Sequence, residues 1–416
     1  MIQWVPTFYK VDTLIVNISE IATLPRIVRG YARAEDIGIV YDGFIAIKKG
    51  LIVYVGEKKD LSRFSAKQVI DAENSLVTPG FIDIHTHLIY KGSREEEFEK
   101  LSLGERYNEI LSRGGGIIRT MRETSNASKE ELLDLLFERT KRLIKGGVTT
   151  AEIKSGYGVD IEHEILLLET LNLFKELSEI DVVPTLLAHV PPPGANREIF
   201  IDLFTKKLIP EAKSLGVSFV DVFCDIGAFT PEETKRILTV AKENGLILRL
   251  HADELSYIGC SDIGVELGCR TIDHLNHTPK NIIEEIGRRD IVVTLSPTTA
   301  MYIAKRRPDV ETMMKNKVIM ALATDHSPAI MNLDMIDVLN LGAIYFSLPP
   351  ANLIASVTIN AAYALNLRYR GSIQRGYLAD LIIWDLPSYR FIGYERRRDL
   401  IRYVIKKGEI LYSSGS

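Results

Sequence analysis

The sequence predicts an α/β protein, a (β/α)8 TIM barrel with a small β-sandwich domain built from both termini. Three observations predict this fold: a length of 416 residues, short β-type runs near both ends, and apolar strand candidates that alternate with helical patterns between them. A barrel of this type accommodates ~250 residues as one unit. We expect residues 77–368 to form the barrel, and residues 1–76 together with residues 369–416 to form the sandwich domain.

Short β-type runs mark the two ends of the chain. They are rich in β-branched and other apolar residues, and Lys49-Gly50 supplies a turn between two of them. Two strand-rich ends around a long middle segment indicate one β domain assembled from both termini. The runs are residues 14–18, 43–48, 51–55, 380–384 and 403–406.

Eight apolar strand candidates separated by helical patterns predict the barrel. Residues 129–145 have apolar side chains at helical spacing, and Ser128 and Glu131 form a capping box before them. Thr230 and Pro231 begin another helix as its cap and its first turn. Repeated strand–helix units without a glycine-rich phosphate loop favour a closed barrel over an open sheet. The candidates are residues 77–87, 148–154, 182–188, 218–224, 246–251, 271–274, 291–295 and 318–324.

Composition argues against several classes of partner. The net charge is −4 and acidic and basic residues are interleaved, so no basic face for nucleic acid is expected. No uncharged apolar run reaches the ~20 residues that a membrane span needs. Cys224, Cys260 and Cys269 lack CxxC spacing, so we expect neither a disulfide framework nor a thiolate zinc site. These features predict a cytoplasmic protein that acts on a small molecule.

Histidines gather where predicted strands end. His85 and His87 lie two residues apart at the end of the first strand, where alternate side chains share a face. His251 ends the fifth strand candidate, and Asp325 follows the eighth. Barrel enzymes place catalytic groups at these strand ends, and buried imidazoles are costly unless something binds them. The pattern therefore predicts an open metal site, with satisfied core or surface histidines as the alternative. The histidines at strand ends are His85, His87, His189, His251 and His274.

Longer sequence blocks narrow this interpretation. They are residues 79–87 (PGFIDIHTH), 92–95 (GSRE), 114–117 (GGGI), 154–158 (KSGYG), 251–254 (HADE) and 321–325 (ALATD). From about Thr78 to Asp385 the chain resembles the imidazolonepropionase family of the amidohydrolase superfamily. The resemblance implies hydrolysis of 4-imidazolone-5-propanoate to N-formimidoyl-L-glutamate in histidine degradation. It also implies a homodimer.

The resemblance implies a role for each matching side chain. The fork-shaped guanidinium of Arg94 suits a substrate carboxylate. Asp325 is expected to orient a water and accept its proton, and His274 or Glu254 to protonate the departing ring nitrogen. The implied ligands of one divalent metal, Zn²⁺ or iron, are His85, His87, His251 and Asp325. The implied substrate contacts are Arg94, Tyr157, His189 and Glu254.

Each substrate contact also has a purely structural interpretation. Arg94 could be an exposed loop residue, and Tyr157 an ordinary loop aromatic. His189 could be a packed histidine whose nitrogens have internal partners. Glu254 could favour the start of a helix through its charge. Burial and unsatisfied polar atoms distinguish the two interpretations.

A single metal is expected from the fourth strand. Superfamily members with two metals use a carboxylated lysine there, and residues 219–225 contain no lysine. Lys154 belongs to the second strand and is a poor substitute.

The segment after Asp325 departs from the family pattern. Imidazolonepropionases usually carry Phe-Asn-Pro-Gly and then Ser or Thr, whereas this chain has His326-Ser327-Pro328-Ala329-Ile330. After His274 the chain also differs, and His277 could be a second polar group in the site. A related ring substrate is therefore an alternative.

Two other functions fit part of this sequence pattern. A deaminase of an aminated heterocycle would use the same histidines and aspartate, but Arg94 and the GGGI block favour a substrate with a carboxylate. A catalytically silent metabolite-binding barrel is the second alternative. Retention of all the metal-ligand candidates argues against it, since a binding module does not need an open metal position.

Overall fold

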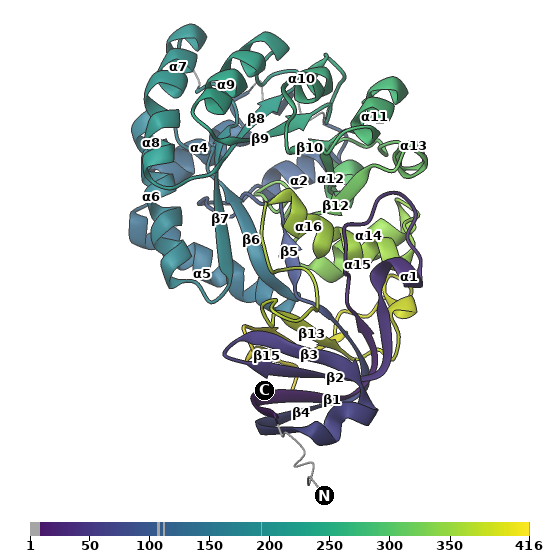
Figure 1. Ribbon diagram of the computed structural model, residues 1–416. Coiled ribbons are helices and arrows are strands. Elements are labelled where there is room, and N and C mark those ends of the chain that lie inside the picture. The colour runs from purple at the N-terminus through teal and green to yellow at the C-terminus, as the bar shows by residue number, and fades with distance from the viewer. Residues whose placement is uncertain (1–8, 106–108, 111–112, 193, 416) are drawn as a thin grey trace, which may run out of the picture. The chain divides into compact units, whose positions relative to one another are not determined.

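The computed structural model describes residues 9–105, 109–110, 113–192 and 194–415. It contains a seven-stranded sheet and an eight-stranded sheet whose strands alternate with helices (Figure 1). The expected (β/α)8 barrel with a β domain from both termini is confirmed. Internal contacts divide the chain into two compact units, Met1–Ile82 with Leu143–Thr150 and Met335–Ser416, and Asp83–Arg142 with Ala151–Asp334.

The seven-stranded sheet joins the two ends of the chain. Its order is β15-β14-β13-β4-β1-β2-β3. The strands β1 and β4 pair in parallel, and the other neighbouring strands pair antiparallel. The C-terminal strand β13 pairs with β4, so both ends of the chain meet in this sheet. The strands are β1 (Tyr9–Ala22), β2 (Ile39–Lys48), β3 (Leu51–Glu57), β4 (Phe64–Pro79), β13 (Leu381–Trp384), β14 (Ile401–Lys406) and β15 (Glu409–Ser413).

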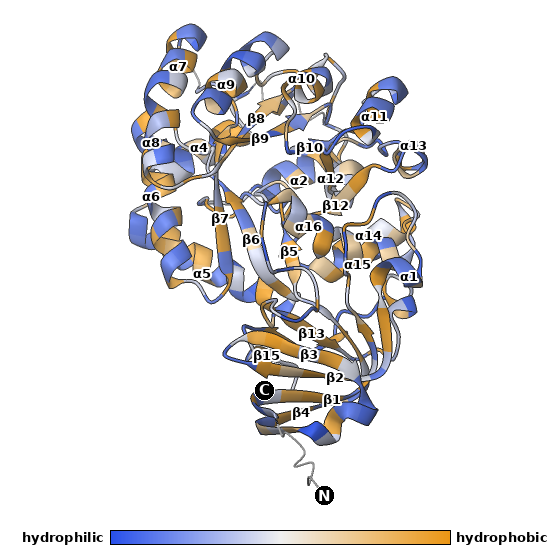
Figure 2. Cartoon of the chain, in the orientation of Figure 1, coloured by the Kyte–Doolittle hydropathy of each residue, from blue (hydrophilic) through white to orange (hydrophobic). Residues whose placement is uncertain are grey.

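An apolar cluster holds this sheet together. Ile15, Ile45 and Val77 from the N-terminal strands pack with Leu381 and Ile405 from the C-terminal strands, and each is fully or almost fully buried. Hydrophobic residues follow the strands of both sheets (Figure 2). Burial of these side chains is the main driving force for joining the two ends, at about 1.5–3 kcal/mol for each. The short helices beside the strands are α1 (Ala34–Ile37), η1 (Lys58–Arg63) and η3 (Tyr389–Phe391).

The eight-stranded sheet has the order β12-β11-β10-β9-β8-β7-β6-β5, in which neighbours in the sheet are also neighbours in sequence. The strands from β7 to β12 pair in parallel with their neighbours, as the alternation of strands and helices predicts. The strands are β5 (Phe81–Asp83), β6 (Val148–Lys154), β7 (Asp181–Ala188), β8 (Phe219–Cys224), β9 (Ile247–Ala252), β10 (Thr271–His274), β11 (Val292–Leu295) and β12 (Ile319–Leu322).

The first expected barrel strand, residues 77–87, is divided in the structure. Residues up to Pro79 belong to β4 of the other sheet, and β5 covers only Phe81–Asp83. Gly80 lies between them, where a Cβ would approach the side chain of Thr149 to 2.5 Å. His85 and His87 therefore lie beyond the regular strand rather than at its end. Apolar composition alone continued across this break, so the sequence did not reveal it.

The segments after β5 and β12 close the barrel. Asp325 N donates to His85 O at 3.1 Å, and His87 N donates to His326 O at 2.8 Å. Thr86 and His326 form an isolated parallel bridge, so the backbone around the two histidines is extended although it is not part of a strand. The residues that the sequence predicts to bind metal thus take part in closing the barrel.

Helices follow most barrel strands and begin where the sequence predicts. Ser128 and Glu131 exchange the two hydrogen bonds of a capping box before α5, and Thr230 and Glu233 do so before α9. Within the described residues no helix is long and apolar enough to cross a membrane. The helices are α2 (Glu95–Ser102), α4 (Ile117–Ser125), α5 (Lys129–Lys145), α6 (Ile161–Leu177), α7 (Arg197–Leu203), η2 (Phe204–Leu208), α8 (Ile209–Ser214), α9 (Pro231–Glu243), α10 (Cys260–Leu267), α11 (Lys280–Gly287), α12 (Pro297–Tyr302), α13 (Val310–Lys315), α14 (Met335–Ile344), α15 (Pro350–Ser356) and α16 (Ile359–Ala364).

A disulfide corrects the expectation drawn from the cysteines. Cys224 at the end of β8 is bonded to Cys260 at the start of α10, with 5.7 Å between their Cα atoms. Cys269 is a buried free thiol. The expectation was wrong because spacing along the sequence does not reveal which strand end and which helix start lie side by side. The bond ties β8 to the segment that follows β9.

The disulfide is expected to stabilise the barrel. It joins residues 36 apart, and the chain-entropy argument gives about 3–4 kcal/mol for a loop of that length. Denaturant unfolding of the wild type with and without a reductant should show a loss of this size. The Cys269→Ser variant is the control, because it should keep the dependence on reductant. Equal unfolding free energies for oxidised and reduced wild type would contradict the prediction.

Candidate active site

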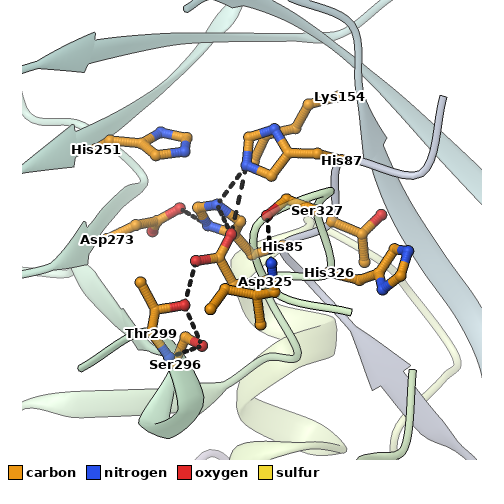
Figure 3. Close-up of polar contacts among 12 residues, drawn as sticks. His85, His87, Lys154, His251, Asp273, Ser296, Thr299, Asp325, His326 and Ser327 are labelled. Atoms are coloured by element: carbon orange, nitrogen blue, oxygen red, sulfur yellow. Dashed lines mark hydrogen bonds and ion pairs between the residues drawn. The ribbon is translucent and has the colours of Figure 1, made fainter. Parts of the chain in front are cut away.

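Three of the four predicted metal ligands converge at a spacing suited to one ion. His85 Nε2 lies 3.3 Å from His87 Nε2, and both lie 3.4 Å from Asp325 Oδ1 (Figure 3). A tetrahedral metal with bonds of about 2.0–2.1 Å places its ligand atoms roughly 3.3–3.4 Å apart. All three side chains are buried, so solvent cannot relieve the crowding of their polar atoms. These residues fit a divalent metal.

His251, the fourth predicted ligand, faces the same point. Its ring centroid lies 4.4 Å from that of His85, and the ligand atoms of His85, His251 and His274 lie within 4.8 Å of one another. His251 Nε2 is buried and has no hydrogen-bond partner among the described residues. Since a buried polar nitrogen is rarely left unsatisfied, this atom also fits a metal bond. Burial lowers the pKa of His85 and His251, which favours the neutral imidazole that binds metal.

Asp325 is held by a hydroxyl that the sequence did not single out. Thr299 Oγ1 donates to Asp325 Oδ2 at 2.5 Å, and Ser296 Oγ lies 3.0 Å from the same hydroxyl (Figure 3). Burial alone would raise the pKa of the Asp325 carboxyl, but the neighbouring His85 and His87 lower it well below its usual range. The carboxylate therefore stays ionised, with Oδ1 directed at the histidines and Oδ2 held by Thr299.

His274 and Glu254 form an acid–base pair beside this cluster. His274 Nε2 lies 3.8 Å from Glu254 Oε2, and both side chains are largely buried. Burial raises the pKa of Glu254 to about 7, although the charge of His274 opposes the shift. Burial lowers the pKa of His274, but the charges of Glu254, Asp325, Asp273 and Asp221 together outweigh it and the net shift is upward. A carboxyl that titrates near neutrality beside an imidazole can hold and release one proton at working pH.

Arg94 is buried in the same pocket, not exposed in a loop. Its Nε donates to Thr120 Oγ1 at 2.9 Å, and its side chain is among the buried polar groups. In the described part of the chain, Arg94 Nη2 has no hydrogen-bond partner. A guanidinium with a free buried nitrogen suits a ligand carboxylate, which would satisfy it. The structural alternative for Arg94 is therefore wrong.

Tyr157 and His189 also line the pocket. Their ring centroids are 5.2 Å apart, and His189 stacks on His87 at 5.1 Å. The turn that carries Tyr157 is held by Glu164, whose carboxylate accepts from Gly156 N at 2.9 Å and from Gly158 N at 2.5 Å. The close packing of Glu164 also explains why position 158 is a glycine, since a Cβ there would lie 2.6 Å from Glu164 N.

Comparisons with known proteins agree with this geometry. A sequence profile described as the amidohydrolase family matches residues 76–411. Imidazolonepropionase from Pyrobaculum arsenaticum is 41% identical over 379 residues, which cover 91% of this chain and 94% of that protein. Imidazolonepropionase from Geobacillus kaustophilus is 36% identical over 394 residues, which cover 92% of this chain and 93% of that protein. This chain belongs to the amidohydrolase family. Within that family it is grouped with the imidazolonepropionases.

Solved structures share the fold of this amidohydrolase at low sequence identity. An adenosine deaminase from Xanthomonas campestris with bound zinc is 15% identical, with a TM-score of 0.71 over 97% of this chain and 93% of that one. Guanine deaminase from Escherichia coli is 16% identical, with a TM-score of 0.72 over 97% of this chain and all of that one. At this identity the likeness concerns the fold.

The segment in which this amidohydrolase departs from the family pattern forms one wall of the pocket. Ser327, Ala329 and Ile330 line it. His326 is turned away, and its Nε2 lies 3.0 Å from the hydroxyl of Tyr90 (Figure 3). His277 is absent from the residues that line this pocket, among those described. The expectation that His277 adds a polar group to the site is not supported by its position.

The structure adds supporting residues that sequence reasoning missed. Thr299 holds Asp325, and Glu164 holds the turn of Tyr157. Lys154, considered only as a substitute for a carboxylated lysine, is instead ion-paired with Glu152 at 2.9 Å and Asp221 at 2.8 Å. Apart from charged residues inside otherwise apolar strands, the sequence carried no signal for these contacts.

Loss of Glu164 is expected to destabilise the protein. Glu164→Ala leaves the amides of Gly156 and Gly158 without their acceptor, at a cost of about 2–4 kcal/mol for two buried donors. Denaturant unfolding measures the loss. Glu162→Ala in the same helix is the matched control, because Glu162 is exposed and its ion pair with Lys207 contributes little. Similar unfolding free energies for the two variants would refute this role of Glu164.

Proposed function

We propose that this chain hydrolyses the ring C–N bond of 4-imidazolone-5-propanoate to N-formimidoyl-L-glutamate, a step of L-histidine degradation. One observation carries the proposal: Arg94, whose buried Nη2 has no hydrogen-bond partner among the described residues, lines the same pocket as His87 and Asp325 of the metal-ligand cluster. The pocket thus offers a carboxylate clamp and a hydrolytic centre to one small molecule. The imidazolonepropionases that are 34–41% identical to this chain support the same substrate.

One divalent metal, Zn²⁺ or iron, would be held by His85, His87, His251 and Asp325. Imidazole and carboxylate ligands suit either ion. When bound, such an ion polarises a carbonyl and acidifies a water to a pKa of about 7. The geometry of the ligand atoms and the free Nε2 of His251 support this ligand set.

The side chains divide the remaining work. Arg94 binds the propionate carboxylate and thereby fixes the ring, while Tyr157 and His189 contact its body. Asp325 orients the attacking water and accepts its proton, and Thr299 holds its Oδ2 in place. The pair of His274 and Glu254 then delivers a proton to the departing ring nitrogen.

The decisive experiment is turnover of freshly generated imidazolone propionate, followed by loss of its ultraviolet absorbance. Metal is measured on the same sample, then removed and restored as Zn²⁺ or Fe²⁺. Decay that requires metal and returns with one of these ions is expected. A metal-loaded protein that leaves this substrate untouched but deaminates an amino-heterocycle would establish the rival function. A protein that turns over neither and still binds a metabolite would establish a silent binding barrel.

Three organisational features are proposed from the family resemblance and the sequence pattern. The chain acts in the cytoplasm, forms a homodimer, and has domain boundaries near residues 76 and 368. Light scattering on the purified protein tests the homodimer, and fractionation of source cells tests the location. Limited proteolysis with mass spectrometry tests the boundaries.

Arg94→Lys is expected to lower kcat/KM by about 10–100-fold, chiefly through KM, because a planar fork is lost while the charge is kept. Steady-state kinetics measure the effect. Arg119→Lys is the matched control, since Arg119 pairs with Glu96 and Glu123 at the surface. An analogue without the carboxylate should react equally poorly with the wild type and with Arg94→Lys. An unchanged KM in Arg94→Lys would remove the carboxylate clamp from the proposal.

Glu254→Gln is expected to shift the basic limb of the kcat/KM profile to lower pH. The charge of Glu254 raises the pKa of His274, so its removal lets that pKa fall. The protonated pair is the active form in leaving-group protonation, and the rate therefore declines at a lower pH in the variant. Kinetics from weakly acidic to basic pH measure the limb. A limb that stays in place would exclude this pair as the proton donor.

A further inference from the structure

Two of the site histidines are hydrogen-bonded through Nδ1 to buried carboxylates. His85 Nδ1 lies 2.7 Å from Asp273 Oδ2, and His251 Nδ1 lies 3.0 Å from Asp221 Oδ1 (Figure 3 shows the first contact). A carboxylate accepts, so each Nδ1 donates its proton and each Nε2 keeps a lone pair. Because only a deprotonated nitrogen binds metal, these contacts select the tautomer that can do so.

Each carboxylate is in turn anchored by a buried cation. Lys154 Nζ lies 2.8 Å from Asp221 Oδ2, and Arg249 Nη2 lies 3.0 Å from Asp273 Oδ2. The side chains of these four residues are at most 1% exposed. A carboxylate at this depth needs a partner to stay ionised, and an ionised carboxylate is the stronger acceptor for an imidazole N–H.

The same charged groups also hold the backbone that carries the histidines. Arg249 Nη2 donates to Ile84 O at 2.8 Å, immediately before His85. Glu152 accepts from Lys154 Nζ at 2.9 Å with one oxygen and from Thr86 N at 3.2 Å with the other. The network thus fixes both the ring orientation and the main chain of this segment.

This support is selective. His87 Nδ1 has no hydrogen-bond partner within the part of the chain that the structure describes, and His87 packs instead on the ring of His189. The carboxylate contacts are therefore not a general consequence of burying a histidine here. They occur at His251 on β9 and at His85 after β5, but not at His87 two residues further on.

We propose that Asp221 and Asp273, anchored by Lys154 and Arg249, are positioning residues that preset His251 and His85 for one divalent metal. The inference rests on the proposed function only in treating these histidines as ligands. In Asp221→Asn and Asp273→Asn an amide N–H can face Nδ1. The ring proton then moves to Nε2, where it blocks metal binding.

The test measures affinity for Zn²⁺ and Co²⁺ by competition with a chelator. Each Asn variant should bind both ions about 10–100-fold more weakly than the wild type. Bound Co²⁺ should show an altered visible spectrum, since its ligand geometry is no longer preset. Asp380→Asn is the matched control, since Asp380 is a buried carboxylate paired with the buried Lys406 at 2.8 Å in the other unit of the chain, and it should keep the wild-type affinity.

A double variant distinguishes a positioning role of Asp221 from a purely structural one. It removes the buried ion pair without restoring the hydrogen bond to His251. Lys154→Met/Asp221→Asn removes both charges of one pair, so it should melt nearer the wild type than Lys154→Met alone. Its metal affinity should nevertheless stay as low as that of Asp221→Asn. Recovery of affinity together with melting temperature would overturn the proposal.

A measurement on the wild type covers the case in which the variants do not fold. With ¹⁵N-labelled histidine and bound Zn²⁺, two slowly exchanging, strongly deshielded Nδ1–H protons are expected, from His85 and His251. Their absence would overturn the proposal, and so would wild-type metal affinity in folded Asn variants. None of these readouts uses imidazolone turnover, so an inactive wild type would count against the proposed function alone.

Discussion

Burial of charge beneath the histidines is the constraint on which this site depends. Lys154 and Arg249 lie among the carboxylates of Glu152, Asp221 and Asp273, all without solvent contact. Isolated charges at this depth would cost several kcal/mol each, so the groups must pair and hydrogen-bond. Together with Asp325, the four carboxylates exceed the two cations by two formal charges. One divalent ion held by the histidines and Asp325 would neutralise that excess.

The barrel meets this constraint because parallel strands bring distant residues to one level. Lys154, Asp221 and Asp273 are far apart in sequence, yet they stand on β6, β8 and β10. His85, His87 and Asp325 then lie just beyond the ends of β5 and β12, where the backbone leaves regular geometry. Asp325 and His274 have φ values of 51° and 77°. Such conformations cost about 1–3 kcal/mol each and persist only where surrounding contacts enforce them.

The pocket combines the expected chemical layout with a wall that departs from the family pattern, within one unit of the chain. Arg94 comes from the insertion after β5 and lines the pocket, and its buried Nη2 has no partner among the described residues, which favours a carboxylate-bearing ligand over a plain heterocycle. Ser327 and Ile330 form the wall that differs from the family pattern. The segment after β9, which carries Glu254, is restrained by the Cys224–Cys260 bond and by Asp225, which accepts from Leu255 N at 2.8 Å. Restraint of this kind preserves the position of a proton donor.

Local pattern was enough to predict the barrel, the β domain from both termini, and the cluster of His85, His87, His251 and Asp325, because strand ends and apolar periodicity are written in consecutive residues. It could not show that the first strand breaks at Gly80, that Cys224 meets Cys260, or that Thr299 holds Asp325. It also could not reveal that Asp221 and Asp273 are hydrogen-bonded to His251 and His85. These features depend on contacts between residues many positions apart, and only the closed barrel determines which side chains meet across it.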